Sequence, residues 1–449
     1  MSDLLSIGAS GVRAYQTALS TVSENIANTG TVGYTRRTTT LAEVSSVNGG
    51  INARNSATGS GVIVVGVGRS ANAYRSQAVR SAGTDLGKTE TSVAWMSRIE
   101  SSLGDNKLGD RLTSFFSSAQ TLSADPTSVP ARAVMLEAAK TAAQAFAATG
   151  KALDTAATEL DSSASQAVQS LNSLGTALAK VNDGLARTPP GSSSAAQLAD
   201  QRDQLLDQMS TLTDVSTAFD DLGRATVRLG GTTGTVFVVG NQSGQASFAR
   251  NDEGAVQFAV TRDGVTTDLS PTGGALAGMA EGAQRIAAAR ESLNGIASDF
   301  TVKVNAVQAQ GRDLDNNPGA PLFAADPANP TDITVSLTDP RGIAAAGATG
   351  GMRDASNLAA LQALRTSGGF ETRTTTLIAG NAAALEQRKT VADAQGAIRD
   401  GAVASLASAS GVDLDSEAVD LLRFQQAYQA SSRVIQTARD TFQTILDLR

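Results

Sequence analysis

Residues 414–449, LDSEAVDLLRFQQAYQASSRVIQTARDTFQTILDLR, return large apolar side chains at steps of three, four and seven positions. This spacing places those side chains on one narrow face of a helix, as in a coiled coil. Gly411 and Asp413 precede the helix, and Glu417 stands where the acidic partner of a capping box is expected. Such a stripe needs a second helix to cover it. Its members are Leu414, Leu421, Phe424, Tyr428, Ile435, Phe442 and Ile445.

The opposite end of the chain offers a partner for this helix. Residues 3–28 are predicted to form an amphipathic helix whose apolar positions are Val12, Tyr15, Leu19, Val22 and Ile26. Because both ends carry similar spacing, the simplest arrangement pairs the two terminal helices as a coiled coil. The stripes either pack only within one monomer or also contact neighbouring subunits, and their presence at both ends favours contact between subunits.

The charge and hydropathy of the chain argue against two classes of partner. The 36 Lys and Arg residues are outnumbered by 43 Asp and Glu residues, which gives a net charge of -7. An acidic total argues against binding to nucleic acid or to anionic membranes. The longest apolar run, around residues 62–67, is much shorter than a membrane span.

Cysteine and histidine are both missing from the sequence. Their absence excludes disulfides, thiol nucleophiles and cysteine zinc sites, and it removes the usual general base. An enzyme is therefore disfavoured, although carboxylate, Lys or Tyr chemistry stays open, and we expect no catalytic, cofactor or metal site. The first residues lack the basic start and unbroken apolar core of a cleaved secretory signal, so the default interpretation is a cytosolic protein.

The order of patterns along the chain predicts helices, then a small β module, then helices again. Helical spacing occupies most of residues 71–212, short alternating runs typical of strands occupy 215–270, and helical spacing returns from 276. We therefore predict a mainly α protein with an inserted small β domain (α+β). The expected domains are discontinuous: an inner pair of terminal helices (1–70 and 404–449), a middle helical domain (71–214 and 275–403) and an outer β domain (215–274).

Two glycine- or aspartate-rich stretches imitate ligand sites. Residues 66–71, GVGRSA, follow a predicted strand (61–69) and precede a helix, like a dinucleotide fingerprint. A long helical tract follows instead of a βαβ unit, so we expect the glycines to let the strand bend into the helix. Residues 313–319, DLDNNPG, imitate the start of a calcium loop, but Pro318 replaces the required glycine and Ala324 the bidentate glutamate, so we expect an Asx turn.

Two charged clusters have alternative interpretations. Asp200, Arg202 and Asp203 imitate paired catalytic carboxylates, but their helical setting favours an intrahelical charge cluster. Arg36 and Arg37 follow a predicted helix stop and either bridge to acidic residues of neighbouring subunits or form a solvated pair.

Several blocks of the sequence resemble a known family. Residues 23–28, SENIAN, followed by 32–37, VGYTRR, look like the N-terminal signature shared by flagellar rod, hook and hook-associated proteins. Residues 123–136, 198–206, 411–417 and 423–430 are similar to blocks that are particular to the first hook-associated protein (FlgK) family. Together these blocks extend across nearly the whole chain. The region 215–270 has no match, and its small size suggests that an outer domain of larger members is missing.

This resemblance implies an axial flagellar protein at the junction of hook and filament, secreted and extracellular. It implies export in an unfolded state and assembly into a helical ring of subunits. The implied partners are further copies of the chain, the hook protein, the third hook-associated protein and an export chaperone at the C-terminal segment, with no nucleic acid and no membrane. The signature adds Asn28, Gly33, Tyr34 and Arg36 to the apolar residues of both stripes as the expected assembly interface. The alternatives are another axial protein, from the hook or distal rod, or a glycine-loop nucleotide-binding enzyme.

Overall fold

The computed structural model describes residues 2–44, 61–251 and 254–447. Residues 48–50, Asn-Gly-Gly, have a sequence typical of a turn and lie outside these ranges. The helices are α1 (Ser2–Ala27), α2 (Ala73–Gly104), α3 (Leu108–Ala124), α4 (Val129–Arg187), α5 (Ser193–Leu212), α6 (Gly274–Gln310), α7 (Ser356–Gly368), α8 (Phe370–Ser410) and α9 (Leu414–Asp447). The mainly α fold with inserted small β elements is therefore confirmed.

The strands form small antiparallel sheets. β1 (Arg37–Glu43) pairs with β2 (Val62–Arg69), and β10 (Gly311–Arg312) pairs with β13 (Ala346–Gly347). One central sheet has the order β3 (Val215–Phe219), β4 (Ala225–Leu229), β5 (Thr235–Val239) and β6 (Gln242–Ser243). A second holds β7 (Gln245–Arg250), β8 (Val256–Arg262) and β9 (Val265–Leu269), and a hairpin joins β11 (Phe323–Asp326) to β12 (Asn329–Val335).

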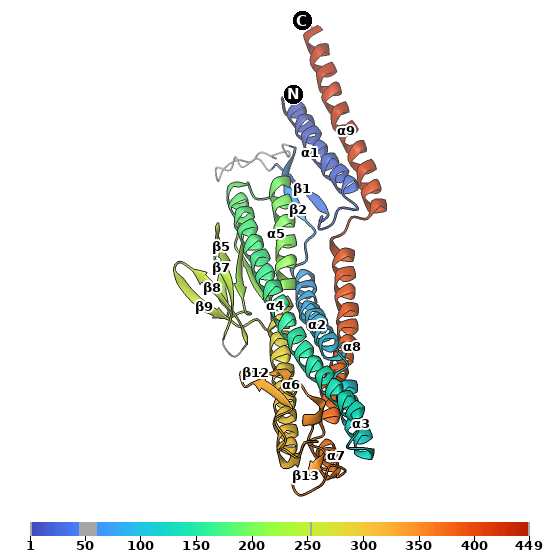
Figure 1. Cartoon of the computed structure of the whole chain (residues 1–449). Helices are drawn as coiled ribbons and strands as arrows, with labels where there is room; N and C mark the ends of the chain where they lie inside the picture. The colour runs from blue at the N-terminus through green and yellow to red at the C-terminus, as the bar shows by residue number, and fades with distance from the viewer. Residues whose placement is uncertain (1, 45–60, 252–253, 448–449) are drawn as a thin grey trace.

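The two terminal helices lie side by side at one end of an elongated molecule (Figure 1). Both chain ends point away from the body, and the β1–β2 hairpin connects α1 to it. Below this pair, α2 packs along α8, and α4 runs through much of the length of the body. The tip opposite the termini holds α7 and β13. The predicted pairing of the terminal helices is thus present, while the division into three domains stays a prediction.

The body is held together by a cluster of six buried phenylalanine rings. Phe300 of α6 lies at its centre, with ring centroids 5.1–6.3 Å from the other five rings. These neighbours come from α3, α4, α8 and β11, so segments far apart in the sequence share one apolar core: Phe115, Phe116, Phe146, Phe323 and Phe370. Edge-to-face ring pairs of this kind add stability beyond burial alone.

The β module packs against α4, because two asparagines of that helix bind its strands. Asn182 Nδ2 donates to the carbonyls of Ala225 and Gly240, and its Oδ1 accepts from the Ala225 amide. Asn172 binds both backbone groups of Ala246 in the same way. The strands therefore share the core of the helices instead of forming an independent one. The sequence patterns predicted strands within residues 215–270, and β3 to β9 lie there.

The loop that imitates a calcium site is an Asx turn, as predicted. Asp313 Oδ1 accepts from the backbone amides of Asp315 and Asn317 at 2.9 and 2.7 Å. Asn316 takes a left-handed conformation with φ of 62°, which asparagine tolerates. The Asp313 carboxylate thus binds backbone amides of its own loop.

Removing the central ring should destabilise the body. We expect Phe300→Ala to lower the free energy of unfolding by about 3–5 kcal/mol, since it leaves a cavity among five rings. Val302→Ala is the matched control on the same helix, because Val302 is 64% exposed, and it should change stability by less than about 0.5 kcal/mol. Urea unfolding followed by circular dichroism measures both, and equal effects would contradict the proposed role of the cluster.

Candidate functional site: the terminal helices and their polar joint

The contact between α1 and α9 is built on small side chains. Along α1 the most buried positions include Gly8, Gly11, Ala14 and Ala18. A Cβ built on Gly8 would lie 2.7 Å from Cγ1 of Ile435, and one built on Gly11 would lie 3.1 Å from Cβ of Ser431. Glycine in a helix interior costs about 1 kcal/mol relative to alanine. Here these glycines allow α9 to approach closely.

The large apolar residues predicted for the two stripes are distributed unevenly. On α1, Val22 is buried, three others are half-buried (Val12, Tyr15 and Leu19), and Ile26 is exposed. On α9 the middle positions are half-buried (Leu421, Phe424, Tyr428 and Ile435), and the Phe424 ring lies 6.4 Å from that of Tyr15. The end positions Leu414, Phe442 and Ile445 are about half exposed. The predicted stripes therefore meet only in part.

Several further apolar side chains of α9 are exposed to solvent, and the sequence analysis did not single them out. Leu422 is 59% exposed. The others are Val419, Val434 and Leu446. Within the ranges that the structure describes, no segment covers these residues. Large apolar side chains exposed along one helix make it a candidate for contact with a partner.

Asn25 is the buried centre of the joint between the two ends of the chain. Its side chain is fully buried and makes four hydrogen bonds. Nδ2 donates to the Arg37 carbonyl at 2.8 Å and to Glu417 Oε2 at 2.9 Å. Oδ1 accepts from the Arg37 amide at 2.9 Å and from the Tyr34 hydroxyl at 2.8 Å. An amide side chain has two donors and two acceptor lone pairs, so its capacity is filled.

Glu417 joins the start of α9 to the N-terminal segment. The capping box predicted here is half correct: Asp413 Oδ1 accepts from the amides of Asp415 and Ser416. The Glu417 side chain instead turns inward, where its carboxylate is fully buried and accepts from Arg36 Nε at 2.6 Å and from Asn25. Arg36 also pairs with Asp420 at 3.3 Å. Two blocks of the sequence resemblance therefore bind each other within one chain.

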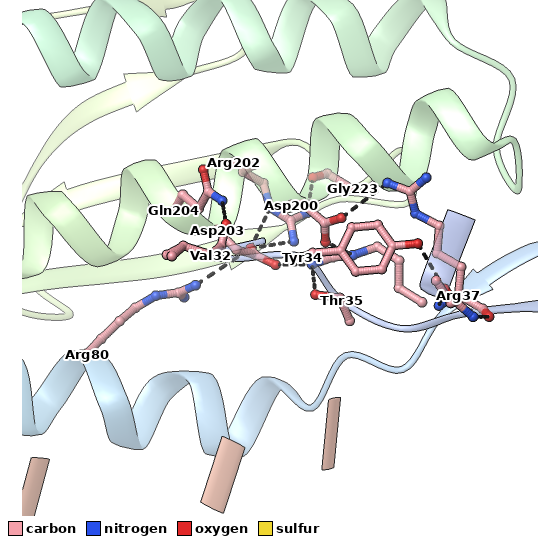
Figure 2. A network of polar contacts seen from close by, with 12 residues as sticks. Val32, Tyr34, Thr35, Arg37, Arg80, Asp200, Arg202, Asp203, Gln204 and Gly223 are labelled. Carbon is pink, nitrogen blue, oxygen red and sulfur yellow. Dashed lines mark hydrogen bonds and ion pairs between the residues drawn. The ribbon is translucent and has the colours of Figure 1, made fainter. Parts of the chain in front are cut away.

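A buried ion network ties this joint to the body (Figure 2). Asp200 of α5 accepts from Arg37 at 3.4 Å and from Arg69 at 2.8 Å. Asp203 accepts from Arg69 at 2.7 Å and lies 3.6 Å from Arg80 of α2. The intrahelical cluster predicted at this place is wrong except for the pair between Arg202 and Asp203. The network instead links four elements.

The solvated pair, one of the two alternatives for Arg36 and Arg37, is also wrong, and contact with neighbouring subunits stays a prediction. Arg37 is buried, pairs with Glu24 and Asp200, and its guanidinium lies 4.9 Å from the centre of the Tyr34 ring. Neither arginine is a solvated residue, and the acidic partners of both belong to the same chain. Both arginines therefore contribute ion pairs inside the joint.

The loop at residues 28–36 needs one glycine. Gly33 has φ of +76°, and a Cβ there would overlap the side chain of Gln204, which donates to the Val32 carbonyl at 2.7 Å. Asn28 is half-buried and bonds back to the Glu24 carbonyl, so it ends the helix. Burial raises the pKa of Tyr34, although Arg37 opposes this shift, and the hydroxyl stays protonated to donate to Asn25.

The glycine stretch at residues 66–71 is not a nucleotide site. β2 pairs with β1 in an antiparallel manner, and among the described strands it has no parallel partner, which a dinucleotide fold requires. A Cβ on Gly66 would lie 3.0 Å from the Gly191 carbonyl oxygen, which accepts from the Val67 amide. Gly66 thus allows close backbone contact with the loop before α5, and the expected role of the glycines in bending the strand stays a prediction.

These features define an elongated helical protein whose two ends are locked together by a polar joint and carry exposed apolar side chains. A model described as the flagellar hook-associated protein FlgK helical domain matches residues 96–323, just over half of the chain. The chain therefore belongs to the FlgK family of flagellar hook-associated proteins. Models of the flagellar basal body rod protein and of the C-terminal region of the basal body rod proteins FlgEFG match residues 5–35 and 404–448.

Individual relatives are similar over part of their length. Flagellar hook-associated protein 1 of Salmonella typhimurium is 36% identical over 155 residues, which is 34% of this chain and 27% of the relative. The Escherichia coli protein of that name is 33% identical over 138 residues, or 30% and 24%. The solved hook junction protein FlgK from Burkholderia pseudomallei aligns with a TM-score of 0.50 at 26% identity, covering 56% of this chain and 47% of the other.

The sequence analysis chose Tyr34 and Arg36 but missed the other residues that form the joint. Asn25 and Glu417 lay within the quoted blocks, but they were not chosen as site residues, and Arg37 and Asp200 were interpreted as surface or intrahelical charges. The sequence did contain a signal: Asn25 is a polar residue at a position that continues the buried face of the first helix. No described helix is both long enough and apolar enough to cross a membrane.

Asp200 should be essential for attaching the terminal pair to the body. We expect Asp200→Ala to destabilise the joint by about 3–5 kcal/mol, because two buried arginines lose a partner. Hydrogen exchange of the β1 and β2 amides measures this local stability. Glu159→Ala is the control, since its pair with Arg98 is solvent-exposed and contributes at most about 1 kcal/mol. Unchanged exchange in Asp200→Ala would contradict the role of the network.

A second test separates two glycines of the same loop. Gly33→Ala should destabilise the loop by about 1–3 kcal/mol, because alanine is strained at this positive φ. Gly30→Ala is the control, since a Cβ there meets nothing within 4 Å. Limited proteolysis at residues 28–36 should therefore accelerate for Gly33→Ala alone; similar rates for both variants would show that the conformation is not limiting.

Proposed function

We propose that this chain is a structural component of the bacterial flagellum that forms the junction between hook and filament. Membership of the FlgK family supports this function, since the matched domain distinguishes this family from the rod and hook proteins. The similar Burkholderia protein is described as a flagellar hook junction protein. The models that match the two ends are shared with rod proteins and do not discriminate between these alternatives.

The exposed apolar surface of α9 is the observation that carries this proposal. At least half of the surface of three residues is exposed: Leu422, Phe442 and Ile445. Burying each of these side chains would contribute a favourable free energy of about 1.5–3 kcal/mol. Such residues are covered when further copies of the chain pack around the terminal pair in a helical ring. The expected interface residues of both stripes, together with Asn28, Gly33, Tyr34 and Arg36, act in this assembly directly or by holding the helices in place.

The partners follow from the place of the protein in the axis. Hook protein lies below the ring, the third hook-associated protein lies above it, and an export chaperone holds the C-terminal segment before export. The chain leaves the cell unfolded and functions in the extracellular flagellum, where it is a structural component and not an enzyme. The lack of cysteine suits passage through a narrow channel, because no disulfide has to be broken.

Deletion and complementation test this function. Deleting the gene should leave hooks without filaments, with filament subunits lost to the medium, and the wild-type gene should restore filaments. Leu422→Asp should fail to restore them while its purified monomer keeps wild-type thermal stability, because the side chain is exposed in the monomer. Val302→Asp, on an exposed position of the body, is the control and should restore filaments.

Other outcomes favour other functions. Loss of hooks in the deletion strain would indicate a hook or distal rod protein. Normal filaments in the deletion strain would refute an axial role, and full complementation by Leu422→Asp would refute assembly through this face of α9.

A further inference from the structure

The small-residue contact between α1 and α9 does not by itself define how the two helices align. Gly8 and Gly11 of α1 lie against Ile435 and Ser431 of α9. Small side chains provide few of the protruding knobs that pack into a matching hole on the facing helix and so restrict the pair to one alignment. If α9 moved by one heptad in one direction, Ala438 would take the place of Ser431 opposite Gly11, one small side chain for another. The larger residues around this contact are only half-buried, so they restrict such movement weakly.

The Glu417 carboxylate behaves differently. It is fully buried, and both oxygens accept hydrogen bonds, one from Asn25 and one from Arg36. A helix rises about 1.5 Å per residue, so a shift of one heptad would move this carboxylate by roughly 10 Å. It would then lose both donors, and Asn25 would lose a hydrogen-bond partner in a buried position. Buried charges and amides without partners are strongly unfavourable.

We propose that Glu417 determines the alignment of the terminal helices: its contact with Asn25 and Arg36 permits one register of α1 on α9 and disfavours the shifted ones. Glu417 is thus a positioning residue, comparable in its physics to a single buried polar residue that fixes the register of a coiled coil. By fixing the register it sets the height of the exposed apolar residues of α9 relative to the body. The inference concerns the single chain, and its test does not depend on the proposed function.

The absence of natural cysteines allows a direct measurement of register. In the full-length protein, Gly11→Cys combined with Ser431→Cys reports the observed alignment, because a Cβ on Gly11 lies 3.1 Å from the Ser431 Cβ. Gly11→Cys combined in turn with cysteine at four other positions of the same α9 face reports shifts of one turn or one heptad in either direction: Phe424, Ala427, Ile435 and Ala438. Disulfide yields are measured in a glutathione redox buffer by mass spectrometry of the cross-linked peptides.

With Glu417 present, the pair at 11 and 431 should dominate. In the Glu417→Ala background, the ratio of this yield to the summed yields of the shifted pairs should fall at least tenfold. Asp420→Ala is the matched control one turn away, since Asp420 is half-exposed and contacts Arg36 only at 3.3 Å. It should leave the ratio within twofold. Glu417→Gln keeps one oxygen acceptor and should give an intermediate ratio.

Two results would overturn the inference. An unchanged ratio in Glu417→Ala would show that the helix contact itself defines the alignment. Loss of all five cross-links would show that Glu417 holds the helices together without selecting their register. Circular dichroism and thermal unfolding of the body, whose core contains no residue of α9, confirm that the variants remain folded.

Discussion

A fully buried carboxylate, that of Glu417, imposes the main constraint on this structure. A charge removed from water needs donors, and both donors come from a segment almost four hundred residues earlier in the chain: Asn25 and Arg36. The chain must therefore end α1 after Asn25 and turn back, so that Arg36 approaches the start of α9. The helix stop, Gly33 and the hairpin that follows are consequences of this requirement.

The joint and the body are stabilised by different physical effects. The body depends on apolar burial around Phe300, whereas the joint depends on carboxylates shared among arginines, with Asp200 serving two of them. Ion pairs near the surface are screened by salt, while ring packing is not. The terminal helices are thus attached to the body through a polar connection whose strength depends on complete pairing. Removing one partner of a buried pair in that connection leaves the charge of the other partner buried and unpaired.

The sequence predicted the parts of this architecture that depend on local patterns. Helical spacing located α1 and α9 and assigned residues 71–212 to helices, because apolar residues recur there over many turns, and the run at 61–69 located β2. The joint could not be predicted in the same way. Glu417 has a local explanation as a capping residue, and nothing near it indicates that its partner is Asn25. Likewise Gly8 and Gly11 look unfavourable in a helix until the position of α9 is known.

The terminal helices also reverse the usual relation between side-chain size and burial. Small residues of α1 are buried, while several of the largest apolar residues of α9 face solvent: Leu414, Leu422, Phe442 and Ile445. A monomer selected only for its own stability would bury the large residues first, because burial is worth about 25 cal/mol for each Å² of apolar surface. Close packing of α1 on α9 through glycines instead leaves a two-helix unit with apolar sides. The polar joint supplies the specificity that this contact lacks, so it fixes where those apolar sides stand relative to the body.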